Sequence, residues 1–129
     1  MRKFIILVLL ISCASTVSAE CSQADLVGRW DFTSNSYSCK FFIIERGQLD
    51  KGSCDELFED GTKETYPASG EIKINRYCKV TGYIETGNVV EPTSRFEILA
   101  GRLKEDKLLA IGEAYHDIYW YASFGMIKY

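Results

Sequence analysis

The final third of the chain alternates between apolar and polar residues, and no other feature of the sequence constrains the fold as strongly. Three such runs, separated by two short polar turns, cover residues 94–104, 107–115 and 118–128. Alternation with a period of two is typical of β-strands that bury one face and expose the other. We therefore expect three consecutive strands of an antiparallel sheet at the C-terminal end of the chain.

The register of these strands follows if each turn contains two residues, Glu105-Asp106 and His116-Asp117. One inner face then collects the large apolar side chains, and its members are Phe96, Ile98, Ala100, Leu109, Ile111, Tyr115, Trp120, Ala122, Phe124 and Met126. The same register places Arg102 and Glu113 on this inner face. The opposite face is also rich in Leu and Ala, which indicates either a register shifted by one residue or a contact with a second copy of the chain, a homodimer.

The rest of the chain contains further short apolar runs that end at Gly, Asn, Asp or Ser. A first strand covers residues 28–33, and one helical turn over residues 23–27 precedes it. About eight short strands in roughly 110 residues favour an all-β fold, a small antiparallel up-and-down β-barrel. Closing the sheet removes the exposed strand edges that promote aggregation, although a two-layer sandwich also fits this pattern.

The first 19 residues have the pattern of a secretory signal peptide, with Arg2 and Lys3 before a short apolar run. This run is shorter than the roughly 20 residues that a membrane-spanning helix needs. The triplet Val17-Ser18-Ala19 fits a cleavage site, so we expect a signal peptide over residues 1–19 and one secreted or periplasmic domain over residues 20–129. The segment Leu10-Ile11-Ser12-Cys13 also resembles a bacterial lipobox, and lipidation of Cys13 would instead attach the protein to a membrane.

Four cysteines remain in the mature domain, and an even number in a small exported chain indicates two disulfides. If the strand that contains Cys39 turns at Arg46-Gly47, Cys39 lies directly opposite Cys54 on the next strand. Directly opposed residues in a sheet are close enough for a disulfide, and Cys21 then pairs with Cys78 by elimination. No two cysteines have the CxxC spacing of a zinc or redox site, so we expect no metal at these residues.

Removal of the signal peptide makes the domain more acidic. All 18 Asp and Glu residues but only 13 of the 15 Lys and Arg residues lie after residue 19, so the net charge changes from −3 to −5. Nucleic-acid binding depends on neutralising phosphates with basic side chains, so we expect no nucleic-acid partner. An acidic segment is expected to be a solvated loop, with a docking surface for a basic protein as the alternative, and it contains Asp50, Asp55, Glu56, Glu59 and Asp60.

Residues 25–32 resemble the opening of the calycins, a group that includes lipocalins, fatty-acid-binding proteins and avidins. In that group a short helical turn precedes a Gly-x-Trp motif, here Gly28 and Trp30, and a meander barrel follows. Lipocalins also tend to place a basic side chain from the last strand over this tryptophan, and Lys128 is the basic residue of the expected final strand. The resemblance implies a β-barrel fold.

The apolar inner face predicts an exported, non-catalytic binding protein that holds a small apolar ligand inside the barrel. The expected lining, in which Arg102 or Glu113 fixes a polar end of the ligand, consists of Trp30, Phe42, Phe96, Ile98, Arg102, Ile111, Glu113, Trp120 and Phe124. The alternative is an exported protein-binding module, such as an inhibitor or immunity-type protein, that uses the acidic segment and exposed tyrosines.

Catalytic chemistry has little support in this sequence. The single histidine, His116, lies in a predicted turn beside Asp117, where a solvent-exposed side chain is favoured over a catalytic base. No Gly-x-Ser-x-Gly motif is present, and the two disulfides leave no cysteine nucleophile in the mature domain. The carboxylates have no spacing that resembles a calcium loop. We therefore expect no enzymatic activity, no cofactor and no metal.

Overall fold

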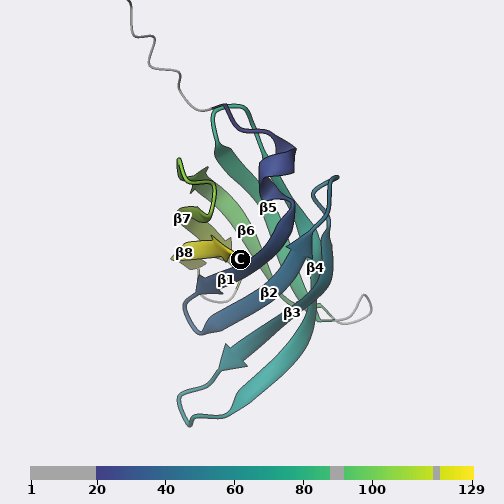
Figure 1. Ribbon diagram of the computed structural model, residues 1–129. Coiled ribbons are helices and arrows are strands. Elements are labelled where there is room, and N and C mark those ends of the chain that lie inside the picture. The colour runs from purple at the N-terminus through teal and green to yellow at the C-terminus, as the bar shows by residue number, and fades with distance from the viewer. Residues whose placement is uncertain (1–19, 88–91, 118–119) are drawn as a thin grey trace, which may run out of the picture.

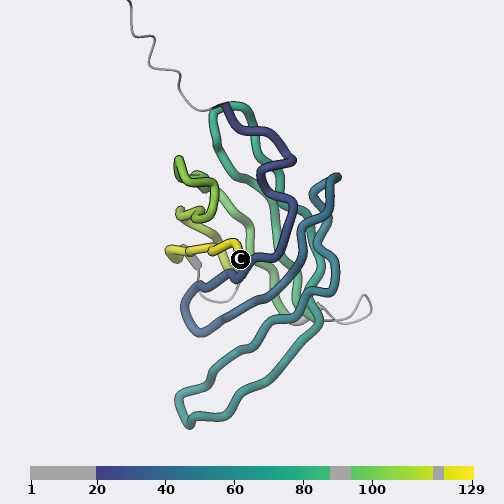
Figure 2. Tube along the Cα trace, in the orientation of Figure 1, coloured from purple at the N-terminus to yellow at the C-terminus, as the bar shows by residue number. Residues whose placement is uncertain are grey.

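The computed structural model describes residues 20–87, 92–117 and 120–129, and within these residues eight β-strands close into one antiparallel barrel (Figure 1). A single 3₁₀ turn, η1 (Gln23–Leu26), precedes the strands, which are β1 (Gly28–Ser34), β2 (Tyr37–Ile43), β3 (Leu49–Leu57), β4 (Lys63–Ile74), β5 (Lys79–Gly87), β6 (Pro92–Leu103), β7 (Leu109–His116) and β8 (Trp120–Lys128). Each strand pairs with its neighbours in sequence, and β8 lies beside β1 to close the barrel (Figure 2). The predicted all-β up-and-down barrel is confirmed.

The two ends of the barrel carry different connections. One end carries η1 and the β4–β5 connection, lies at the top of Figure 1, and is called the η1 end here. The opposite end carries the β1–β2 and β3–β4 connections. We call it the hairpin end, because the β3–β4 hairpin extends beyond the neighbouring β1–β2 turn (Figure 1).

Large side chains fill the interior of the barrel. An eight-stranded barrel is just wide enough for its inward-facing side chains to fill it. The ring of Phe32 lies against those of Phe96 and Phe124, with centroids 5.4 and 5.5 Å apart, and all three residues are at most 4% exposed. The other large core side chains include Trp30, Ile43, Ile72, Ile84 and Met126.

Trp30 connects this core to the η1 end. Its indole Nε1 donates a hydrogen bond of 2.7 Å to the carbonyl oxygen of Leu26 in η1. The Nζ atom of Lys128 lies 5.9 Å from the centroid of the Trp30 ring and donates a hydrogen bond of 3.1 Å to the carbonyl oxygen of Asp25. The basic side chain expected over this tryptophan is therefore present, and it ties the last strand to η1.

Both predicted disulfides are confirmed. Cys39 and Cys54 are direct partners between β2 and β3, with their Cα atoms 4.0 Å apart, and Cys21 bonds to Cys78 at the η1 end. The turn between β2 and β3 is one residue longer than predicted. A β-bulge after Lys40 compensates for that extra residue and restores the expected pairing at the cysteines.

The predicted register of the last three strands is wrong, although the strands and their order are as expected. Ile98 pairs with Ala114 rather than with Glu113, and a β-bulge directly after Ile98 shifts the remaining β6–β7 pairs by one more residue. His116 pairs with Trp120, so the β7–β8 connection has three residues rather than two, and the register there is displaced by three residues. A shift by an odd number of residues reverses which face points inward.

The corrected register changes the composition of the inner face. Ala110 and Ala114 are buried on β7, whereas Ile111 and Glu113 face outward. The bulge on β6 also turns Arg102 outward. Before its last residue, β7 therefore contributes the small side chains of Ala110 and Ala114 to the interior.

Candidate functional site

The nine residues predicted to line a ligand site divide between the two faces of the barrel wall. Four of them are buried in the interior, and these are Trp30, Phe96, Ile98 and Phe124. Four others face outward, so the prediction that they line the interior is wrong, and these are Phe42, Arg102, Ile111 and Glu113. The strand β8 begins at Trp120, but the side chain of this residue lies outside the described part of the structure.

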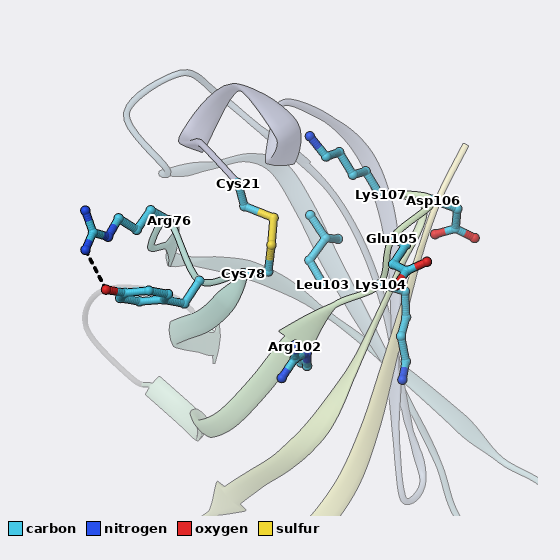
Figure 3. A pocket seen from close by; sticks show the side chains of 10 residues that line it. Cys21, Arg76, Cys78, Arg102, Leu103, Lys104, Glu105, Asp106 and Lys107 are labelled. Atoms are coloured by element: carbon cyan, nitrogen blue, oxygen red, sulfur yellow. Dashed lines mark hydrogen bonds between the residues drawn. A yellow bond between two sulfur atoms is a disulfide. The ribbon is translucent and has the colours of Figure 1, made fainter. Parts of the chain in front are cut away.

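Two of the cavities that the described residues form open on the outside of the barrel. The smaller has a volume of about 450 Å³, and the outward-facing Phe42 lines it together with Arg29, Lys40, Phe41, Asp50, Lys51 and Tyr129. The larger has a volume of about 920 Å³ and lies at the η1 end beside the Cys21–Cys78 disulfide (Figure 3). Both are open to solvent, and neither gathers the four buried residues of the predicted lining.

Basic side chains surround the larger cavity, but they do not converge on one point. These side chains belong to Arg76, Arg102, Lys104 and Lys107. Figure 3 shows Arg76 on one side of the cavity and Lys104 and Lys107 on the other, pointing in different directions. The Arg76 guanidinium donates a hydrogen bond of 2.5 Å to the Tyr77 hydroxyl, and Lys107 forms an ion pair with Asp25. This arrangement provides no common position for an anionic ligand.

The hairpin end of the interior contains a cluster of polar side chains. The hydroxyl oxygens of Thr86 and Ser94 are joined by a hydrogen bond of 2.7 Å, and the Ser94 hydroxyl donates to the Tyr37 hydroxyl at 3.5 Å. Glu56 is the direct strand partner of Tyr37, and the His116 ring lies 5.1 Å from the Tyr37 ring between centroids. All five residues are at most 8% exposed, and we call them the inner polar cluster.

His116 is an ionisable residue of the inner polar cluster. Its ring also lies 4.3 Å from that of Phe96, and no part of the residue is exposed to solvent. Burial lowers the pKa of His116, and the nearby carboxylates of Asp117 and Glu56 oppose that shift. The prediction that His116 is a solvent-exposed turn residue is therefore wrong. It ends β7 instead, on the inner face of the barrel.

The β3–β4 hairpin presents an exposed tip at the same end of the barrel. Leu57 and Phe58 are 58% and 36% exposed, and the acidic residues Glu59 and Asp60 follow them. Thr62 donates hydrogen bonds from its side chain and its backbone to Oδ1 of Asp60, and these bonds lower the pKa of the Asp60 carboxyl. We call residues 57–60 the hairpin tip.

The acidic segment predicted for protein binding does not form one continuous surface. Asp50 lies near the start of β3, toward the η1 end, and Glu56 is turned into the barrel. Asp55 is half-buried, lies 3.7 Å from the Nζ of Lys63, and accepts a hydrogen bond from Thr65. Of the predicted acidic residues, only Glu59 and Asp60 belong to the hairpin tip.

The inner polar cluster was missed at the sequence level, although a signal for it exists. In a strand, residues two positions apart point to the same face. Glu56 is two residues from Cys54, and Tyr37 is two residues from Cys39, so the confirmed disulfide places both on the inner face. His116 carries no such signal, because its orientation depends on the length of the β7–β8 connection.

Among residues 20–87, 92–117 and 120–129, no group of three His, Cys, Asp or Glu side chains is placed to hold a metal ion. No helix in the described part of the chain is long and apolar enough to cross a bilayer.

Comparisons with known proteins extend the description of the fold. No family model and no curated protein matches the chain. A solved structure of a redesigned β-barrel, b11L5F_LGL, superimposes with a TM-score of 0.56, at 10% sequence identity, over 84% of this chain and 94% of that one. Because the identity is so low, the likeness concerns the barrel fold alone.

Proposed function

We propose that the protein is an exported, non-catalytic module that binds another protein through the hairpin tip. The observation that carries this proposal is the pairing of two exposed apolar side chains, Leu57 and Phe58, with the acidic residues Glu59 and Asp60. An apolar contact surrounded by charge is the usual composition of a protein interface. The partner would present a basic surface with an apolar depression.

The packing of the barrel supports a function on its surface. Phe32 packs against both Phe96 and Phe124 in the interior, so an apolar ligand there would have to displace rings that stabilise the fold. The two disulfides and the closed sheet hold the hairpin on a rigid base. Preorganised surfaces bind with a smaller loss of conformational entropy. This division between a filled core and an exposed tip is suited to recognition of a macromolecule.

Site-specific photo-crosslinking in the exporting cell tests this proposal. The photoreactive residue p-benzoylphenylalanine replaces Phe58 in the hairpin tip, and a matched variant carries it at Glu105 in the β6–β7 turn, at the other end of the barrel. We expect a discrete adduct from position 58 and none from position 105. The changes Glu59→Gln and Asp60→Asn together should reduce the adduct at position 58. Adducts of equal yield at both positions, or none at position 58, would contradict the proposal.

Binding of a small ligand is the second candidate, and the inner polar cluster favours it. The cluster gathers hydroxyl groups, a carboxyl group and an imidazole at one end of an otherwise apolar core. The hydroxyls of Thr86 and Ser94 and the imidazole of His116 are suited to a small ligand with both donors and acceptors. The double change Thr86→Val and Ser94→Ala should then abolish binding of this small ligand while leaving the hairpin tip unchanged.

A further inference from the structure

The outer face of β6, β7 and β8 is apolar over three adjacent strands. Ile111 and Ile127 are 41% and 58% exposed, and the other apolar side chains that face outward there belong to Leu99, Leu109, Tyr115 and Tyr121. Leu109 is the direct strand partner of Ile127, and the rings of Tyr115 and Tyr121 lie 5.4 Å apart. We call this surface the outer wall. An exposed apolar surface of several side chains is typical of an interaction site.

Two opposite charges lie within the outer wall. Arg102 on β6 is the direct partner of Ile111 on β7, and Ala100 on β6 is the direct partner of Glu113 on β7. Arg102 and Glu113 therefore occupy opposite corners of this group of four residues. Both are exposed, and neither forms an ion pair or a side-chain hydrogen bond with another described residue.

This arrangement is complementary to itself. Two copies can face each other across a twofold axis that lies in the plane of contact and runs along the diagonal from Ala100 to Ile111. Rotation about this axis places Arg102 of one copy opposite Glu113 of the other. The symmetry repeats this ion pair on the other side of the axis. The same diagonal continues to Ile127 on β8, since Ile127 pairs with the residue two positions before Ile111. The axis thus follows apolar side chains, and the two charges on each copy meet opposite charges.

We propose that the outer wall binds a second copy of the chain in a symmetric dimer, with two reciprocal Arg102–Glu113 ion pairs around a contact between the two Ile111 side chains. Paired charges fix the orientation of such a contact. A convex barrel buries only part of its wall against another, so we expect a dissociation constant on the order of 10 µM. This inference goes beyond the proposed function, because the hairpin tip lies across the barrel from β7 and β8 and stays accessible in the dimer.

Sedimentation velocity over a range of concentrations tests the dimer, using the exported chain with both disulfides formed. We expect conversion from monomer to dimer as the concentration rises. The single changes Arg102→Glu and Glu113→Arg each place like charges opposite each other twice, and each should weaken the dimer by at least about 10-fold. The double change exchanges the charges and should restore it. Ile111→Lys should leave a monomer.

Two matched controls separate this contact from general effects of charge. Arg46→Glu, in the exposed β2–β3 turn, reverses a charge outside the outer wall, and Thr81→Lys adds a lysine to the exposed face of β5. Both variants should dimerise as the unmodified chain does. Circular dichroism checks that each monomeric variant is folded. A chain that stays monomeric at about 500 µM, well above the expected dissociation constant, would overturn the proposal. An unchanged dimer in Ile111→Lys, or a double variant that is not restored, would also overturn it.

Discussion

At the scale of single residues, burial of His116 links one proton to the stability of the barrel. Its ring is enclosed by Tyr37 and Phe96, so the protonated form would have to be accommodated among aromatic rings. Desolvation therefore lowers the pKa of His116 below its value of about 6.5 in the unfolded chain. The unfolded state then binds the proton more readily than the folded state.

The free energy of unfolding should consequently fall as the pH drops below about 6.5, by at most about 1.4 kcal/mol per pH unit from this one group. Above that pH both states are neutral at this position, and the contribution to stability is fully present. His116→Phe keeps a ring in the stack and removes the proton, so its stability should change less over this range. Urea unfolding of both proteins at pH 7.5, 6.5 and 5.5 measures the difference. Identical pH dependence would contradict a buried, neutral His116.

At the scale of secondary structure, the strands and disulfides were predictable from the sequence, whereas the registers were not. Alternation of apolar and polar residues identifies a segment as a strand. The Cys39–Cys54 bond also sets the pairing of β2 with β3, whatever the length of the turn between them. The last three strands have no such restraint. A bulge after Ile98 and one additional turn residue before Trp120 leave no mark in the hydropathy pattern. Each reverses a face, which is why Ile111 and Glu113 were expected inside.

The candidate site was less predictable than the fold for the same reason. Trp30, Phe96 and Phe124 were correctly expected in the interior, because β1, β8 and the part of β6 before its bulge keep the predicted orientation. His116 was misplaced, because its inward orientation follows from the three-residue β7–β8 connection. Exposure of Phe58 could not be derived from the pattern, since it depends on how far the β3–β4 hairpin extends beyond its neighbours.

The β4–β5 pair depends on a glycine that permits close approach of two strands. Gly82 has a φ of 142°, and a Cβ atom there would collide with the backbone carbonyl oxygen of Glu71. Gly82→Ala should therefore destabilise the protein by about 2 kcal/mol or more, since both the strain and the collision act on backbone atoms. Gly125→Ala is the matched control, because its new methyl group would meet only the Thr33 hydroxyl, at 3.9 Å. Thermal unfolding of the two variants measures the difference, and equal losses would refute this account of β4 and β5.

At the scale of the whole molecule, the two disulfides hold different parts of the chain. Cys39–Cys54 joins adjacent strands across a sequence separation of 15, whereas Cys21–Cys78 ties the N-terminal segment to the start of β5 across a separation of 57. A crosslink that closes a longer loop removes more conformational entropy from the unfolded chain. The N-terminal disulfide should therefore make the larger contribution to global stability.

Removing each bond by paired Cys→Ala changes tests this ranking. The loop-closure relation gives a loss of roughly 4 kcal/mol for the Cys21–Cys78 bond and roughly 3 kcal/mol for the Cys39–Cys54 bond. Guanidinium unfolding of the two double variants, both compared with the intact protein, gives the two losses. A greater loss on removal of the Cys39–Cys54 bond would show that packing around β2 and β3 outweighs the entropy of the unfolded chain.

The barrel is filled by its own side chains and, on the function proposed above, should act through its surface. Native mass spectrometry of residues 20–129, purified without detergent and with both disulfides formed, tests this claim most directly. We expect the mass of the chain with two disulfides, as a monomer or a dimer, and no bound small molecule. A stoichiometric apolar molecule that stays bound through purification, and is lost only when the barrel unfolds, would contradict the claim.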